Sequence, residues 1–158
     1  MNPKINNMKK LIIFTLISLS TYNLYSQNKT IKGRVIAEDF EILPGVSIIT
    51  NDTIVVGKTD LNGFFQIDIH ASEKKILFFS IGLEQTTIEL LDKCDNVEVV
   101  MMLDFTYDFI TLKTINRKRK KRFKKLPNIY KQAFLRNLFE SEYPCYTQEL
   151  KLYYLDEN

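Results

Sequence analysis

Few residues in this 158-residue chain could carry out chemistry. His70 is its only imidazole, and Cys94 and Cys145 are its only thiols. Zinc catalysis needs about three protein ligands beside an open position. Serine–histidine or cysteine–histidine catalysis would have to use His70, for which the sequence places no nucleophile, and no glycine-rich phosphate loop is present. We therefore predict a surface histidine at a strand end, and no enzyme activity, catalytic residue, metal site or cofactor.

A run of positive charge is the second chemical feature. Residues 111–125 contain nine basic and no acidic side chains, whereas residues 27–110 contain seven basic and 14 acidic ones. Such a run can bind phosphates by counterion release or lie on anionic lipid; the alternative is a solvated linker or helix balanced by the acidic region. Phe123 is the only aromatic side chain in this run that could stack on a base, and export would separate the protein from genomic DNA, so no nucleic-acid partner is predicted. The candidate contacts with an anionic partner are Arg117, Lys118, Arg119, Lys120, Lys121 and Arg122.

The N-terminus has the order of residues found in secretory signal peptides. Lys9 and Lys10 precede an apolar run over residues 11–19, which is shorter than the roughly 20 residues that a membrane-spanning helix needs. We predict a signal peptide over residues 1–26, and an exported protein that is periplasmic or outer-membrane-associated. Export permits a Cys94–Cys145 disulfide without requiring it, so two unpaired thiols remain an alternative.

Residues 29–103 alternate between apolar and polar side chains, and turn residues interrupt them about every ten positions. This pattern predicts β-strands near 30–37, 45–50, 53–59, 64–70, 75–81, 85–91 and 96–103. Residues 76–81 are apolar on both faces, as in a central strand. Pro44 and Gly45 indicate a type II turn, and Asp60, Asn62 and Gly63 indicate a hairpin turn. A calcium loop is the alternative for that second turn, but Ala71 stands where its bidentate glutamate would be needed.

Four blocks in this region resemble a known family. Residues 31–36, 43–48, 57–67 and 77–83 are similar to the carboxypeptidase regulatory-like domain, which is transthyretin-like in fold and frequent in exported proteins of Bacteroidetes. The resemblance implies an all-β, seven-stranded Greek-key β-sandwich over residues 27–104. The family also forms N-terminal extensions of TonB-dependent receptors. After Asp104 this sequence leads to a short tail and not to the plug and barrel of such a receptor.

The C-terminal part reads as a basic linker or extension over residues 105–125, then an amphipathic helix and tail over residues 126–158. Pro127 suits the first turn of a helix, and a stripe of apolar side chains follows at spacings of three and four. We expect the stripe to contact the protein's own core, with a partner's groove as the alternative. The candidate contacts are Phe105, Tyr107 and Phe109. Residues 148–155 could form a final strand.

These features predict a non-catalytic, exported β-sandwich that acts as an interaction module of the bacterial cell envelope, for example as an accessory to outer-membrane transport or surface machinery. Its expected partner is an unidentified envelope protein, with contact to anionic lipid or glycolipid through the basic segment. A glycan-binding module is the alternative, although tryptophan is absent. A hydrolase ranks third, since it would depend on His70.

Overall fold

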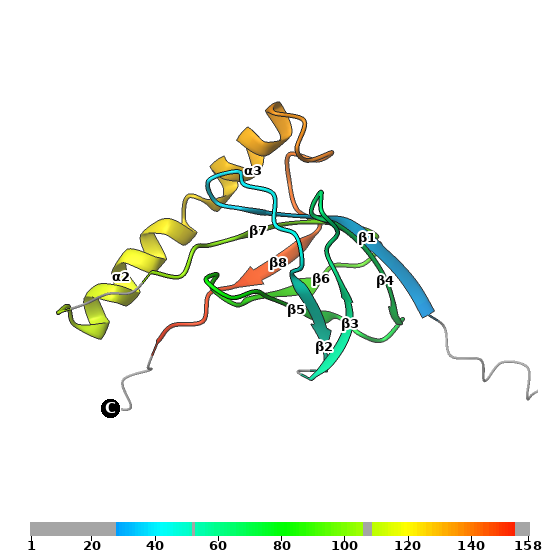
Figure 1. Cartoon of the computed structure of the whole chain (residues 1–158), viewed down its shortest axis with the longest axis horizontal. Helices are drawn as coiled ribbons and strands as arrows, with labels where there is room; N and C mark the ends of the chain where they lie inside the picture. Colours follow the sequence, from blue (N-terminus) through cyan, green and yellow to red (C-terminus); the bar gives the residue numbers. More distant parts are fainter. Residues whose placement is uncertain (1–27, 52, 106–108, 154–158) are drawn as a thin grey trace, which may run out of the picture.

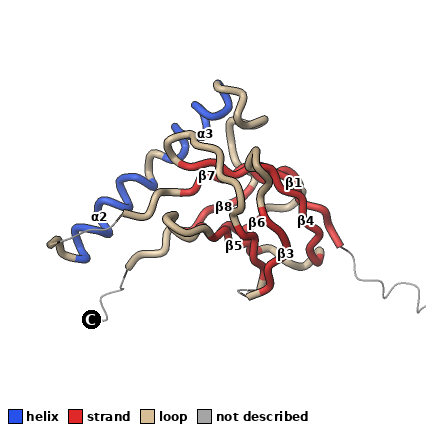
Figure 2. Tube along the Cα trace, viewed as in Figure 1, coloured by secondary structure: helices blue, strands red, loops and turns tan. Residues whose placement is uncertain are grey.

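The computed structural model describes residues 28–51, 53–105 and 109–153, and the predicted signal peptide lies outside them. Two β-sheets lie face to face, and two helices run along one side of them (Figure 1). Figure 2 shows how strands dominate the centre of the molecule, with the helices at its margin. The predicted two-sheet β architecture is therefore confirmed.

The first sheet has three strands in the order β4-β1-β7. β1 (Asn28–Ala37) pairs antiparallel with β4 (Phe64–His70) and parallel with β7 (Asn96–Met101). The second sheet has five antiparallel strands in the order β3-β2-β5-β6-β8. Its members are β3 (Ile54–Lys58), β2 (Ser47–Thr50), β5 (Lys75–Phe79), β6 (Thr86–Leu90) and β8 (Tyr146–Glu149).

The core lies between the two sheets, where alternate side chains point inward. In β4, Phe65, Ile67 and Ile69 are buried while the residues between them are exposed, as the sequence predicts. β5 is a central strand, as predicted from residues 76–81, but it is shorter than predicted. The strand ends at Phe79, and Ile81 is 93% exposed, because the chain turns at Gly82 with a positive φ of 80°.

The turns join the strands differently from the sequence prediction at one place. Pro44 and Gly45 form a turn in which Gly45 has a φ of 71°. The turn at Asp60–Gly63 is present, but its flanking strands β3 and β4 belong to different sheets, so the predicted hairpin is wrong. The reason is that the Gly63 carbonyl accepts a hydrogen bond from Val35 of β1 at 2.8 Å, which leads β4 into the first sheet.

The C-terminal segment completes the second sheet. β8 spans residues 146–149 and pairs with β6, so the expected strand over 148–155 begins earlier and ends earlier, and the sandwich has one strand more than the seven predicted. A disulfide between Cys94 and Cys145 joins the start of β8 to the loop before β7. That bond resolves the alternative left open by the sequence, and it fixes where the strand starts.

Two helices follow β7, namely α2 (Leu112–Phe123) and α3 (Leu126–Leu135). Both helices contact the sheets, so the predicted segments that meet at 104/105 and at 125/126 pack against one another. α3 buries Leu126, Tyr130 and Ala133 in the common core, which confirms the expected contact with the protein's own core. Among the expected contact residues, Phe109 is fully exposed, so the expectation is wrong for it. Phe105 is half exposed and lies beside Arg122 of α2, and Tyr107 lies outside the described residues. α3 packs against β7 instead.

Two buried tyrosines cover the outer edge of β7. The Tyr130 hydroxyl accepts a hydrogen bond from the Val100 N–H at 3.1 Å, and the Tyr146 hydroxyl donates one to the Glu98 carbonyl at 2.7 Å. Because Tyr146 donates to Glu98, Tyr130 must donate to Tyr146 in the hydrogen bond between the two hydroxyls. An edge strand exposes unpaired backbone groups that favour aggregation, and these side chains satisfy two of them.

Candidate functional site

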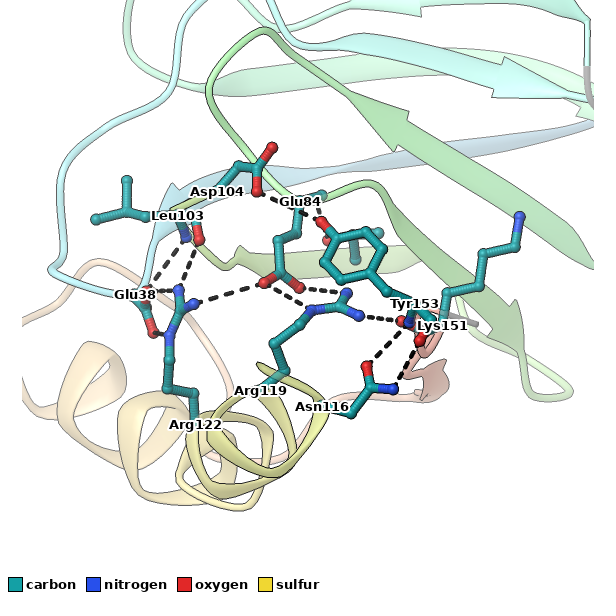
Figure 3. Close-up of polar contacts among 10 residues, drawn as sticks. Glu38, Glu84, Leu103, Asp104, Asn116, Arg119, Arg122, Lys151 and Tyr153 are labelled. Atoms are coloured by element: carbon teal, nitrogen blue, oxygen red, sulfur yellow. Dashed lines mark hydrogen bonds and ion pairs between the residues drawn. The ribbon is translucent and has the colours of Figure 1, made fainter. Parts of the chain in front are cut away.

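Most of the basic segment, residues 111–125, forms helix α2. Some of the segment's nine cations face the sheets and the others face outward. Arg119 is buried and Arg122 is partly buried, and both point toward the sheets (Figure 3). The other seven are exposed. Five of these recur at spacings of three and four and so share one face of the helix. We call them the basic ridge: Lys113, Arg117, Lys120, Lys121 and Lys124.

The inner face of α2 is held by a buried ion pair. Arg119 and Glu84 each have side chains that are 4% exposed, and they meet through two parallel contacts: Nε to Oε1 at 3.0 Å and Nη2 to Oε2 at 2.7 Å. This bidentate geometry is the strongest form of arginine–carboxylate contact. A buried charge without its partner would be costly, so the pair fixes the rotation of α2 about its own axis.

Arg122 extends this network by one helical turn (Figure 3). Its guanidinium contacts the Glu38 carboxylate, approaches Glu84 at 3.5 Å, and donates to the Leu103 carbonyl at 2.7 Å. It also lies over the ring of Phe105, at 4.5 Å from the centroid. The two arginines thus hold α2 to loops that follow β1 and β5 and to the segment after β7.

The chain beyond β8 closes the other side of this network. Asn116 of α2 donates to the Tyr153 carbonyl at 2.7 Å and accepts from the Tyr153 N–H at 3.0 Å. Arg119 donates to the Lys151 carbonyl and lies 4.0 Å from the centroid of the Tyr153 ring. Burial raises the pKa of the Tyr153 hydroxyl, and the nearby Asp104 carboxylate adds to this effect. The inner face is therefore enclosed by residues from three separate parts of the chain.

The structure divides the six residues predicted to contact an anionic partner. Arg117, Lys118, Lys120 and Lys121 are exposed, while Arg119 and Arg122 serve the inner face. Nothing in the sequence indicated Glu38, Glu84 and Tyr153 as partners of α2, because they lie far from the helix along the chain. Asn116 lies in the helix itself, but its type and position gave no sign of its contact with Tyr153. The spacing of Ile115, Arg119 and Arg122 was the available signal, since it places two arginines beside an apolar residue on one helical face.

The other residues singled out in the sequence lie in turns away from α2. Pro44 and Gly45 precede β2, and Asp60, Asn62 and Gly63 connect β3 to β4. The Asp60 carboxylate accepts hydrogen bonds from the N–H groups of Asn62 and Phe64, both at 2.8 Å. One carboxylate oxygen of Asp60, which a calcium loop would use as a ligand, thus stabilises the turn instead. Among the described residues, no group of three or more His, Cys, Asp or Glu side chains is placed to bind a metal ion.

His70 does meet a hydroxyl, contrary to the sequence prediction. It lies exposed at the end of β4, and its Nδ1 is 2.5 Å from the Ser72 Oγ and 3.2 Å from the Ser72 N–H. Both contacts span only two residues, as in the local turns that serine commonly forms. A nucleophile needs a base that is itself oriented by a third group, and the described part of the chain shows no such group on His70.

A separate open cleft of about 640 Å³ lies between the three-stranded sheet and the segment after α3. Phe64 of β4 and Phe134 of α3 are partly exposed in it. Arg34 lies over the Phe64 ring and donates to the Leu138 carbonyl at 3.0 Å. Burial raises the pKa of Glu98, although the N–H groups of Glu140 and Ser141 donate to its carboxylate and oppose that shift.

Within residues 28–51, 53–105 and 109–153, no helix is both long enough and apolar enough to cross a membrane. The basic ridge and the cleft are both exposed features of the described residues. No protein-family model and no curated protein sequence matches the chain.

Proposed function

We propose that this protein is an exported, non-catalytic interaction module of the bacterial cell envelope, and that it acts through the basic ridge. We further propose that residues 27–104 are a carboxypeptidase regulatory-like domain with the transthyretin-like Greek-key topology. Two stacked sheets, and turns at Pro44–Gly45 and Asp60–Gly63, support this assignment. The Cys94–Cys145 disulfide is compatible with export.

One observation carries the proposed function. Residues 111–125 use two of their nine cations to attach helix α2 to the sandwich, and they leave the other seven exposed along the helix and directly after it. Like charges three and four residues apart on a helix repel one another, so the arrangement costs stability and needs a compensating role. An anionic surface that meets the ridge would supply it, because it neutralises the charges together.

Fractionation of the producing cells tests this function. The ridge variant carries Arg117→Gln, Lys120→Gln and Lys121→Gln. The matched control carries Lys58→Gln, Lys74→Gln and Lys93→Gln, which neutralise three exposed lysines outside both the ridge and the cleft. We expect the original protein and the control to sediment with the envelope fraction in a salt-sensitive manner, and the ridge variant to shift to the soluble fraction. Equal retention of all three proteins would refute the role of the ridge.

Export is tested separately by mass spectrometry of the same fractions. We expect the envelope-associated protein to begin at Gln27, after removal of residues 1–26. A protein that retains Met1 and is recovered from the cytoplasm would contradict export without affecting the measured role of the ridge.

Glycan binding is the second candidate, and the cleft beside Phe64 and Phe134 favours it. Aromatic faces combined with polar side chains, here Lys32, Asn96 and Asn137, are suited to the apolar faces and hydroxyl groups of sugars. Affinity gels that contain envelope polysaccharide test this alternative. We expect no retardation; retardation that Phe64→Ala abolishes would establish the cleft, and not the ridge, as the binding site.

A further inference from the structure

We propose that the partner of the basic ridge is the surface of an anionic lipid bilayer. This inference rests on the proposed function and specifies its partner. The ridge is the outward, convex side of a helix that runs along the margin of the molecule (Figure 1), and not a groove into which a peptide could insert. A convex row of long side chains suits an extended, deformable surface with many anionic groups.

The kinds of cation on the two faces of α2 support lipid over a specific acidic peptide. Arginine forms bidentate, directional contacts with carboxylates, whereas lysine is a hydrated point charge on a flexible stem. The directional residues Arg119 and Arg122 are used internally. Among the exposed cations of the segment, Arg117 is the one arginine, and the others are lysines. Such a surface attracts diffuse negative charge and does not select a fixed arrangement of carboxylates.

Apolar side chains at the start of α2 provide a second observation. Phe109 is fully exposed three residues before the helix, and Leu112 at its first position is 46% exposed. Basic amphipathic segments bind bilayers by combining electrostatic attraction with apolar side chains placed in the headgroup region. Phe109 and Leu112 would supply that apolar contact at one end of the ridge.

The charge of the remaining chain defines the orientation of the docked protein. Residues 27–110 contain twice as many acidic as basic side chains, so an anionic membrane would repel the sandwich while it attracts the ridge. The protein would therefore lie with α2 against the headgroups and with the sandwich directed away from the membrane.

Vesicle sedimentation with the full chain tests the proposal. Vesicles of phosphatidylcholine alone are compared with equimolar phosphatidylcholine and phosphatidylglycerol, and the readout is the ratio of the two partition coefficients. The apolar run over residues 11–19 contributes to binding of both vesicle types, and the N-terminal lysines are the same in every variant, so neither obscures a difference between variants. Since each cation near an anionic surface contributes about fivefold, we expect the ridge variant to lose at least about tenfold of the ratio and the control variant to lose little.

Two further measurements separate the possible outcomes. Phe109→Ser should weaken binding to anionic vesicles by a severalfold factor that added salt does not change, because the contact is apolar. Polyglutamate in solution serves as a protein-like anion. If the ridge variant loses binding to polyglutamate but not to vesicles, the lipid assignment is wrong and the proposed function stands. If the ridge substitutions change neither the binding to polyglutamate nor the binding to vesicles, the lipid assignment and the proposed function are both wrong.

Discussion

The two faces of helix α2 carry the same type of charge and have opposite relations to the rest of the molecule. On the inner face, Arg119 and Arg122 are matched by Glu84 and Glu38 and by backbone carbonyls (Figure 3). On the outer face, the basic ridge is exposed. The comparison shows that net charge of a segment is a poor guide to its role. The partners of each cation decide whether it stabilises the fold or is available to another molecule.

The largest expected effect is on the inner face. Arg119→Ala leaves the Glu84 carboxylate buried without its partner, and we expect the free energy of unfolding to fall by about 3–5 kcal/mol. Urea denaturation followed by circular dichroism measures the change. Arg117→Ala, two residues away and exposed, is the matched control and should change stability by no more than about 0.5 kcal/mol. Equal effects of the two substitutions would remove the distinction between the faces.

A double substitution sharpens this result. Replacing both members of a buried ion pair with apolar residues is often neutral or stabilising, whereas removing one member is not. We therefore expect Glu84→Leu combined with Arg119→Leu to be more stable than Arg119→Ala. If the double variant is the less stable one, the ion pair itself contributes a large net stabilisation.

The next effect concerns the disulfide that holds the C-terminal part of the inner face. Cys94 and Cys145 are 51 residues apart, and a loop of that length predicts a loss of about 2–4 kcal/mol when both become alanine. Hydrogen exchange should then accelerate at Ile115 and Arg119, because Lys151 and Tyr153 cover that face. Reduction of the original protein should reproduce the effect. An unchanged exchange rate in α2 would show that the inner face does not depend on β8.

A pH titration tests the buried tyrosine pair between α3 and β8, formed by Tyr130 and Tyr146. Burial raises the pKa of Tyr130 from 10.0 to about 12 and that of Tyr146 in the same direction. The unfolded chain releases these protons first, so stability should hold below pH 10 and fall as the pH rises above it. By pH 12 the loss from Tyr130 should be about 2 kcal/mol, and Tyr146 should add a loss of the same sign. Urea midpoints between pH 8 and 12 measure this loss. The exposed Tyr143 is the control, and Tyr143→Phe should leave the profile unchanged.

The smallest effect is expected on the outer face and has the opposite sign. Lys113 lies in the first turn of α2, where the helix dipole disfavours a cation, and no acidic residue is present in that turn. Lys113→Glu should therefore increase stability by about 0.3–1 kcal/mol and also weaken binding to anionic vesicles. The thermal midpoint measures the first effect. A loss of stability would mean that Lys113 has a structural role like that of Arg119.

Local patterns predicted most of the sandwich. The alternation in β4 fixed which side chains face the core, and all seven strands predicted between residues 29 and 103 are present with small changes at their ends. The spacing of apolar residues also predicted helix α3 and its contact with the core. These features depend on neighbours within a few residues, so the order of side chains is sufficient to define them.

The candidate site was only partly predictable because its contacts are distant in sequence. Glu84 and Arg119 are 35 residues apart, and Glu38 and Arg122 are 84 apart. No periodicity relates a glutamate in a strand-connecting loop to an arginine in a later helix. For the same reason the sequence assigned Arg119 and Arg122 to the contact with an anionic partner, whereas they contact carboxylates of the protein itself. The contact between His70 and Ser72 was not predicted because it depends on the conformation of a turn.

The parallel pairing of β1 with β7 limits the order in which the chain can fold. Lys32 pairs with Asn96, so the first sheet requires a strand made some 64 residues after β1. Folds dominated by such distant contacts form slowly. A chain that crosses a membrane with its N-terminus first would have to keep β1 without its parallel neighbour until most of the sequence had emerged. During that interval Ile31, Val35 and Ile36 would be exposed and prone to aggregate, so the proposed export predicts that the rates of secretion and folding are linked.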